Sequence, residues 1–118
     1  MKYARLYTGT DGETHYEDLE MELRPVPGRS SHGCPWAATE AIFLSSVKDS
    51  GASLNEWHPA PAHQFIVTLS GTTEIEASDG EIRRFGPGQV LMVADTSGKG
   101  HRTRYQGARS ALHIPIAG

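Results

Sequence analysis

Short runs of alternating apolar and polar residues, each ended by glycine, proline, aspartate or serine, recur along the 118-residue chain. No apolar pattern with the 3.6-residue period of a helix persists between them. The 13 glycines and 7 prolines supply the turns that many short strands require. Strands are therefore predicted over residues 15–23, 39–46, 64–70, 73–77, 81–85, 89–94, 101–105 and 109–116. Strands at this spacing predict an all-β chain folded as a sandwich or barrel.

The length and charge of the chain exclude several classes of protein. A chain of 118 residues has room for one core, so residues 1–118 are predicted to form a single domain. A net charge of -3 gives no basic surface for nucleic acid, and no apolar run predicts a signal peptide or a membrane-spanning segment. The one cysteine, Cys34, cannot form a disulfide within the chain. We expect a cytoplasmic domain that binds neither nucleic acid nor membrane.

Histidine is the first indication of function. The chain has six histidines, and imidazole is the commonest metal ligand and a proton carrier near neutral pH. They stand at positions 15, 32, 58, 63, 101 and 113.

The segment 57–71 carries a recognisable spacing that resembles the first sequence motif of the cupin superfamily. That motif has two histidines one residue apart, then a glutamate three or four residues later, and a glycine after six more residues. Here Gly71 follows Gln64 with that gap, which puts His58 at the first histidine position, Ala60 at the second and Gln64 at the glutamate. One histidine is kept and two ligands are changed.

The second cupin motif begins with a glycine and later carries a histidine and an asparagine. Gly88 matches the opening glycine and His101 the histidine, whereas Ala94 replaces the motif's proline and Tyr105 its asparagine. The resemblance spans about residues 54–105 and is closest to small single-domain bacterial cupins with degenerate metal-binding motifs. It implies a double-sheet jelly-roll β-barrel of antiparallel strands, with a ligand pocket between the sheets.

Strand alternation indicates which side chains enter that pocket. Gln64 shares a strand face with Ile66, and the resemblance implies that this face lines the barrel. His101 lies on the face opposite Arg102 and Arg104, whose burial would be costly, so His101 is predicted to point inward. The predicted ligand pocket consists of His58, Gln64, His101, Tyr105, His15 and Trp57.

Two hypotheses for the pocket remain open. In the first, His58, His101 and Gln64 hold one divalent transition metal (Fe, Mn, Ni, Cu or Zn), with His15 or His63 as further ligands, in an enzyme of dioxygenase or isomerase type. In the second, the loss of two ligands leaves a metal-free pocket that binds a small organic molecule without catalysis. No residue is assigned a catalytic role.

Three further expectations concern the surroundings of the pocket. His15 and Leu19 are predicted to share the inward face of the strand over 15–23, and the proline-rich run 25–35 is predicted to be a surface loop. The run 98–100, Gly-Lys-Gly, is predicted to be a flexible loop at the rim. Because exposed strand edges must be covered, two barrels are expected to pair edge to edge as a homodimer.

Overall fold

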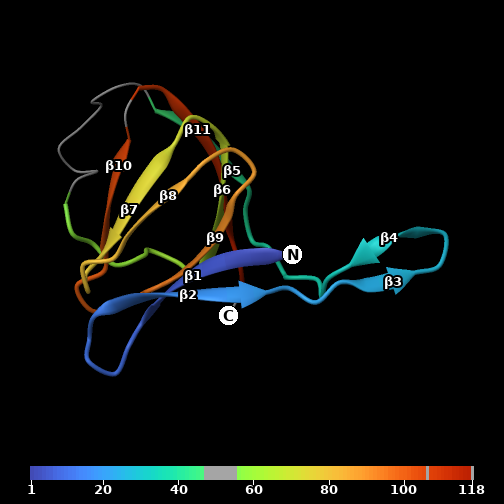
Figure 1. The fold of residues 1–118 in the computed structure, drawn as a ribbon, viewed down its shortest axis with the longest axis horizontal. Coiled ribbons are helices and arrows are strands. Elements are labelled where there is room, and N and C mark those ends of the chain that lie inside the picture. Colours follow the sequence, from blue (N-terminus) through green and yellow to red (C-terminus); the bar gives the residue numbers. More distant parts are fainter. Residues whose placement is uncertain (47–55, 106, 118) are drawn as a thin grey trace.

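In the computed structural model, which describes residues 1–46, 56–105 and 107–117, two β-sheets face each other and a hairpin extends away from them (Figure 1). The larger sheet has the strand order β2-β1-β9-β6-β11-β5, the smaller sheet has the order β10-β7-β8, and β3 pairs with β4 alone. The strands are β1 (Lys2–Thr8), β2 (Thr14–Glu20), β3 (Arg24–Val26), β4 (Arg29–His32), β5 (Ile42–Ser46), β6 (Gln64–Ser70), β7 (Thr73–Ala77), β8 (Ile82–Phe85), β9 (Val90–Ala94), β10 (His101–Tyr105) and β11 (Arg109–Pro115). The described residues contain no helix, which confirms the all-β prediction.

Each predicted strand is present, with bounds that differ by no more than three residues. The prediction missed β1 and the β3–β4 hairpin. The expectation of a loop over 25–35 was therefore wrong in part, because β3 and β4 pair around a turn in which Gly28 has a φ of 71°. Almost every side chain of this hairpin is exposed, so no apolar face marked its strands in the sequence.

The larger sheet is mixed rather than purely antiparallel. Strand β1 runs parallel to β9, with Leu6 opposite Val93, whereas the other described pairs are antiparallel. The expectation of antiparallel strands throughout was wrong at this pair. Among the described strands the pairing does not close a barrel, since β2 and β5 are the edges of the larger sheet and β10 and β8 those of the smaller one.

The core lies between the two sheets and joins them. Leu6 and Val93 of the larger sheet pack in one cluster with Ile75 and Phe85 of the smaller sheet. Tyr16 belongs to the same cluster, and its hydroxyl donates a hydrogen bond to the Ile75 carbonyl at 2.9 Å. Burial raises the pKa of the Tyr16 phenol well above its ordinary value, so Tyr16 stays protonated and remains a donor.

The inward face of β2 is the opposite of the predicted one. Thr14 and Tyr16 are buried, whereas His15 and Leu19 lie on the outer side. The reason is that the Tyr16 ring packs near Phe85, with ring centroids 6.2 Å apart, and fills the space that the prediction assigned to the His15 face.

Candidate functional site

His58 and His101, which are 43 positions apart in the chain, lie side by side. Each donates its backbone N–H to the other's carbonyl at 3.0 Å, and the centroids of their rings are 4.7 Å apart. Gly100 has a φ of 84°, and a Cβ there would overlap the His58 carbonyl group. The run 98–100, predicted as a flexible rim loop, therefore ends in a glycine on which this pairing of the two histidines depends.

Asp95 is a residue beside the candidate site that the sequence reasoning missed. It follows the end of β9, is completely buried, and its Oδ2 accepts a hydrogen bond from His101 Nδ1 at 2.6 Å. The same oxygen accepts a second hydrogen bond from the Thr14 hydroxyl at 3.1 Å. A signal for it exists in the sequence, because Asp95 is an acid directly after the apolar run Val90–Ala94 and shortly before His101.

The hydrogen bonds of the two histidines determine which ring nitrogen each presents. The carboxylate of Asp95 can only accept, so Nδ1 of His101 carries the proton of that bond. The backbone carbonyl of Glu56 likewise accepts from His58 Nδ1 at 3.0 Å. In the neutral form of each ring the lone pair is then on Nε2, the atom that accepts a proton or binds a metal.

Further polar groups lie between the sheets close to the core. Gln64 is buried on the face of β6 that it shares with Ile66, which packs against the inner core. Thr68 is buried on the same face, and neither its hydroxyl nor Asp95 Oδ1 has a hydrogen-bond partner among the described residues. Buried polar atoms normally have partners, so Asp95 Oδ1, next to His101, leaves room for a hydrogen bond from a ligand or water there, whereas Thr68 lies beside the other end of β9.

Strand β11 adds two polar side chains, Arg109 and His113, that are not among the six residues of the predicted ligand pocket. Arg109 is buried and donates from Nη1 to the Thr73 hydroxyl at 3.2 Å. His113 is partly buried, and burial together with the charge of Arg109 lowers the pKa of His113 below its ordinary value. Alternation along β11 puts both on the face of Ala111, which is opposite Thr68 on β6.

Trp57 and Tyr105, the two aromatic members of the predicted pocket, have different outcomes. Trp57 is stacked against Arg102 and Lys99, each with its charged group 4.7 Å from the ring centroid. Arg102 alternates with the buried His101 on β10, so Trp57 lies on the outer side of the smaller sheet. The side chain of Tyr105 lies outside what the structure describes.

His15 lies on the opposite face of β2 from Thr14, the neighbour that bonds Asp95. Both of its ring nitrogens face carboxylates, with Nε2 at 2.9 Å from Asp11 and Nδ1 at 2.9 Å from Asp79. The hydrogen bond to Asp11 raises the pKa of His15 above its ordinary value of 6.5, desolvation opposes this, and the bond to Asp79 reinforces it. The cluster ties the turn after β1 to the turn after β7.

The stability that His15 contributes is expected to depend on pH. The pKa of His15 is higher in the folded protein than in the unfolded chain, where it is near 6.5. The stability that His15 contributes is therefore fully present at pH values below 6.5 and is lost as the pH rises through the pKa of the folded protein. The difference in unfolding free energy between wild type and His15→Asn should therefore be larger at about pH 5.5 than at about pH 9 in urea titrations. The exposed His32 provides the control, since His32→Asn should give the same small difference at both values. Equal differences for His15→Asn at both ends of this range would contradict the prediction.

The described residues contain no group of three or more histidine, cysteine, aspartate or glutamate side chains arranged to hold a metal ion. His58 and His101 are adjacent, but neither of the two further ligands that were predicted, His15 and His63, forms such a group with them among the described residues. His15 is engaged by Asp11 and Asp79, and Nε2 of His63 is buried without a hydrogen-bond partner among the described residues. The structure thus brings together two imidazoles of the predicted set.

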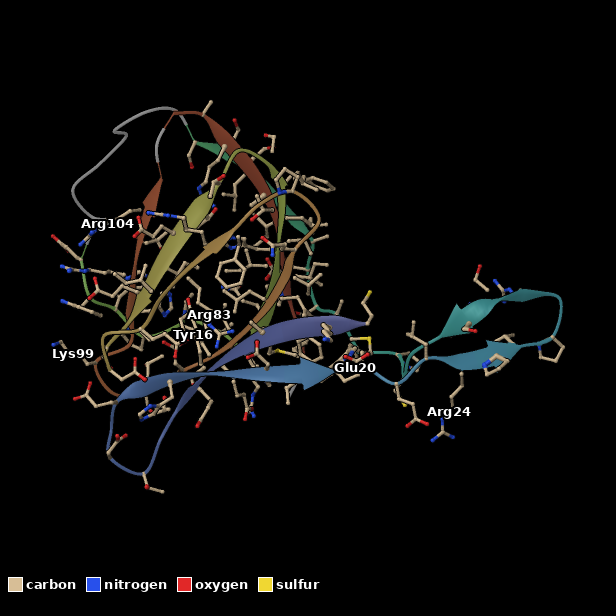
Figure 2. All side chains as sticks on the ribbon, in the orientation of Figure 1. Tyr16, Glu20, Arg24, Arg83, Lys99 and Arg104 are labelled. Atoms are coloured by element: carbon tan, nitrogen blue, oxygen red, sulfur yellow. The ribbon has the colours of Figure 1, made fainter. Side chains whose placement is uncertain are left out.

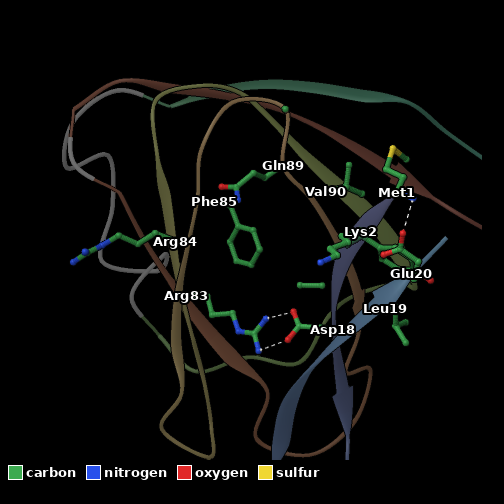
Figure 3. A pocket seen from close by; sticks show the side chains of 13 residues that line it. Met1, Lys2, Asp18, Leu19, Glu20, Arg83, Arg84, Phe85, Gln89 and Val90 are labelled. Atoms are coloured by element: carbon green, nitrogen blue, oxygen red, sulfur yellow. Dashed lines mark hydrogen bonds and ion pairs between the residues drawn. The ribbon is translucent and has the colours of Figure 1, made fainter.

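A cleft of about 700 Å³ opens elsewhere, between β8 and the β1–β2 pair (Figure 3). The ion pair between Arg83 and Asp18, with its shortest distance 2.7 Å, crosses the cleft, while Phe85 and Lys2 point into it. Arg83 lowers the pKa of Asp18 and also stacks on the Tyr16 ring, which Figure 2 shows beside it between the sheets. None of the predicted pocket residues lines this cleft.

Comparison with known proteins gives a likeness at the level of fold. Protein NMB1881 from Neisseria meningitidis, known from a crystal structure, is similar to this chain with a TM-score of 0.52 and 17% sequence identity, over 65% of this chain and 72% of that one. No protein-family model matches the sequence, and no curated protein matches it. The described residues also form no helix that is long and apolar enough to span a membrane.

Proposed function

We propose that this chain is a cupin-like protein of jelly-roll architecture that binds a small organic molecule between its two sheets, at His58, Gln64 and His101. The motif positions of these residues support this proposal, as does the fold of two facing sheets. A cytoplasmic location is part of the proposal and is supported by Cys34, an exposed free thiol and the sole cysteine of the chain.

The observation that carries the proposal is the buried pair of Asp95 and His101. Burying a carboxylate and an imidazole is costly, and core packing alone gives no reason to keep them there. Asp95 uses Oδ2 for two hydrogen bonds, while its buried Oδ1 has no partner among the described residues. Ionisable groups held in this way are typical of functional sites.

The surrounding groups indicate the chemistry of the ligand. Asp95 Oδ1 requires a donor, Nε2 of His101 in its neutral form accepts, and the amide of Gln64 does both. A small molecule with hydroxyl and carbonyl or carboxyl groups would satisfy these atoms. In this proposal Asp95 is a positioning residue, because it orients the His101 ring.

A second candidate is the divalent-metal enzyme, favoured by the hydrogen bonds at both Nδ1 atoms. These bonds leave Nε2 of His58 and His101 as the nitrogens for a metal, and the carboxylate of Asp95 is a typical outer partner of a metal-bound histidine. Gln64 would be the third ligand, and its neutral amide is a weaker donor than the glutamate of the cupin motif. When bound, the metal would act as a Lewis acid or activate dioxygen.

Native mass spectrometry of protein purified without a histidine tag tests both candidates. An adduct with the mass of a small organic molecule, or one formed with a panel of hydroxy acids, supports the ligand-binding protein. A single divalent metal supports the enzyme. In either case the adduct should be lost in His58→Ala and kept in the control His32→Ala, because His32 lies on the β3–β4 hairpin. The proposal would be overturned if the wild type formed no adduct of either kind, or if the adduct were still present in His58→Ala.

A further inference from the structure

The larger sheet has an apolar outer face along β5, β6 and β11, on the side away from the core. Strands β5, β6 and β11 pair so that Leu112 is opposite both Phe43 and Val67, which puts these side chains on one face. Phe65 and Ile114, also opposite each other, belong to a cluster separate from the inner core. We call the outer patch the five apolar residues on this face together with Leu69, which lies next to them where the pairing of β6 with β11 is irregular: Phe43, Phe65, Val67, Leu69, Leu112 and Ile114.

The outer patch is only partly covered by its own chain. Trp36 lies over Phe65, with ring centroids 5.2 Å apart, but is itself 47% exposed. Phe43 is 74% exposed and Leu69 is 45% exposed. A sheet face with side chains of this size in contact with water indicates an interaction surface.

The β3–β4 hairpin also lacks a surface to pack against. Its two strands pair only with each other, and nearly all of its residues are exposed. It extends well beyond the two sheets, as the position of Arg24 in Figure 2 shows. An isolated two-stranded hairpin is marginally stable in water, so this one is expected to be ordered by contact with another surface.

The surface area of the chain agrees with a missing contact. The chain exposes 7006 Å², against roughly 6,300 Å² expected for a compact protein of 12.8 kDa. Its radius of gyration is 14.8 Å, against about 13.5 Å expected for 118 residues. The extended hairpin contributes to this excess, and an interface that buried about 700 Å² on each copy would be near the standard size of ~800 Å² for each partner.

We propose that a second copy of this chain covers the outer patch and the β3–β4 hairpin, so that the protein is a homodimer joined through sheet faces. The outer patch carries no charged side chain, so two copies of it meet without burying an unpaired charge. A two-fold axis brings the same patch of each copy to the interface and leaves no patch exposed. The interface thus differs from the edge-to-edge pairing expected from the sequence, since it uses the face of the sheet that includes the edge strand β5.

Sedimentation velocity at micromolar concentration tests this proposal. The wild type should sediment with a mass near twice 12.8 kDa. Phe43→Ser and Leu69→Ser should each weaken dimerisation at least tenfold, and both replace side chains exposed enough that the fold of one copy is kept. Ile82→Ser is the matched control, because Ile82 is 48% exposed but lies on β8 of the smaller sheet, so this variant should remain a dimer.

Hydrogen exchange gives a second readout for the hairpin. Backbone amides of residues 24–32 should exchange more slowly in the wild type than in Phe43→Ser at the same protein concentration. A wild-type mass of 12.8 kDa, or a Phe43→Ser protein as dimeric as Ile82→Ser, would overturn the proposal. If residues 24–32 exchange at the same rate in both proteins, the hairpin is not part of the interface, and the proposal that the second copy covers it is wrong.

Discussion

Gly100→Ala is expected to destabilise the fold by about 4 kcal/mol or more, or to prevent folding. A Cβ at this position would overlap the carbonyl group of His58, which is rigid backbone held by hydrogen bonds to His101. The φ of 84° adds the strain of the left-handed region for any residue with a side chain. Relief requires the His58 segment to move away, which separates the two histidines. Urea unfolding of the purified variant measures the effect.

Gly80→Ala is the matched control for this prediction. Gly80 also has a positive φ, of 100°, but a Cβ there would meet nothing within 4 Å. It should therefore cost only about 1–2 kcal/mol, the strain of the backbone conformation alone. If the two alanine variants are equally stable, the close approach of Gly100 to His58 is not a constraint on the fold.

Asp95→Ala is expected to lower the free energy of unfolding by about 3–5 kcal/mol, because it removes the acceptor from two buried donors at once. The Nδ1–H of His101 and the hydroxyl of Thr14 both bond to Asp95 Oδ2, at 2.6 and 3.1 Å. Asp95→Asn keeps the size and one acceptor oxygen, so it should cost less. Thr14→Ala removes one donor and leaves the carboxylate bonded to His101, and about 1 kcal/mol is expected.

A double-mutant cycle separates this interaction from general damage to the core. Asp95→Ala combined with His101→Phe should be less destabilising than the sum of the two single variants, since the same hydrogen bond is removed in both. Strict additivity in urea unfolding would contradict a direct interaction. A loss below about 1 kcal/mol for Asp95→Ala would show that the pair does not stabilise the fold.

The candidate site was predictable only in part. His58, Gln64 and His101 were identified by their spacing to Gly71 and Gly88, because a motif records which residue types recur at fixed positions. The structure adds Asp95, through its hydrogen bond to His101, and Thr14, through its hydrogen bond to Asp95, and neither belongs to the motif. The prediction put His15 on the wrong face of its strand. Tyr16 shares a strand face with three acidic residues and was therefore assigned to the solvated face, but its ring is buried in the core and its hydroxyl bonds the buried Ile75 carbonyl.

The sequence by itself determined that the chain is all-β and where most of its strands begin and end, because alternation and turn residues act over a few neighbouring positions. It did not reveal the parallel pairing of β1 with β9, the hairpin with two exposed faces or the apolar outer patch. Contacts between distant segments determine which strands become neighbours. They also determine which side of β5, β6 and β11 is covered by the rest of the chain. Only the tertiary structure decided these features, and with them that the buried carboxylate of Asp95 meets His101.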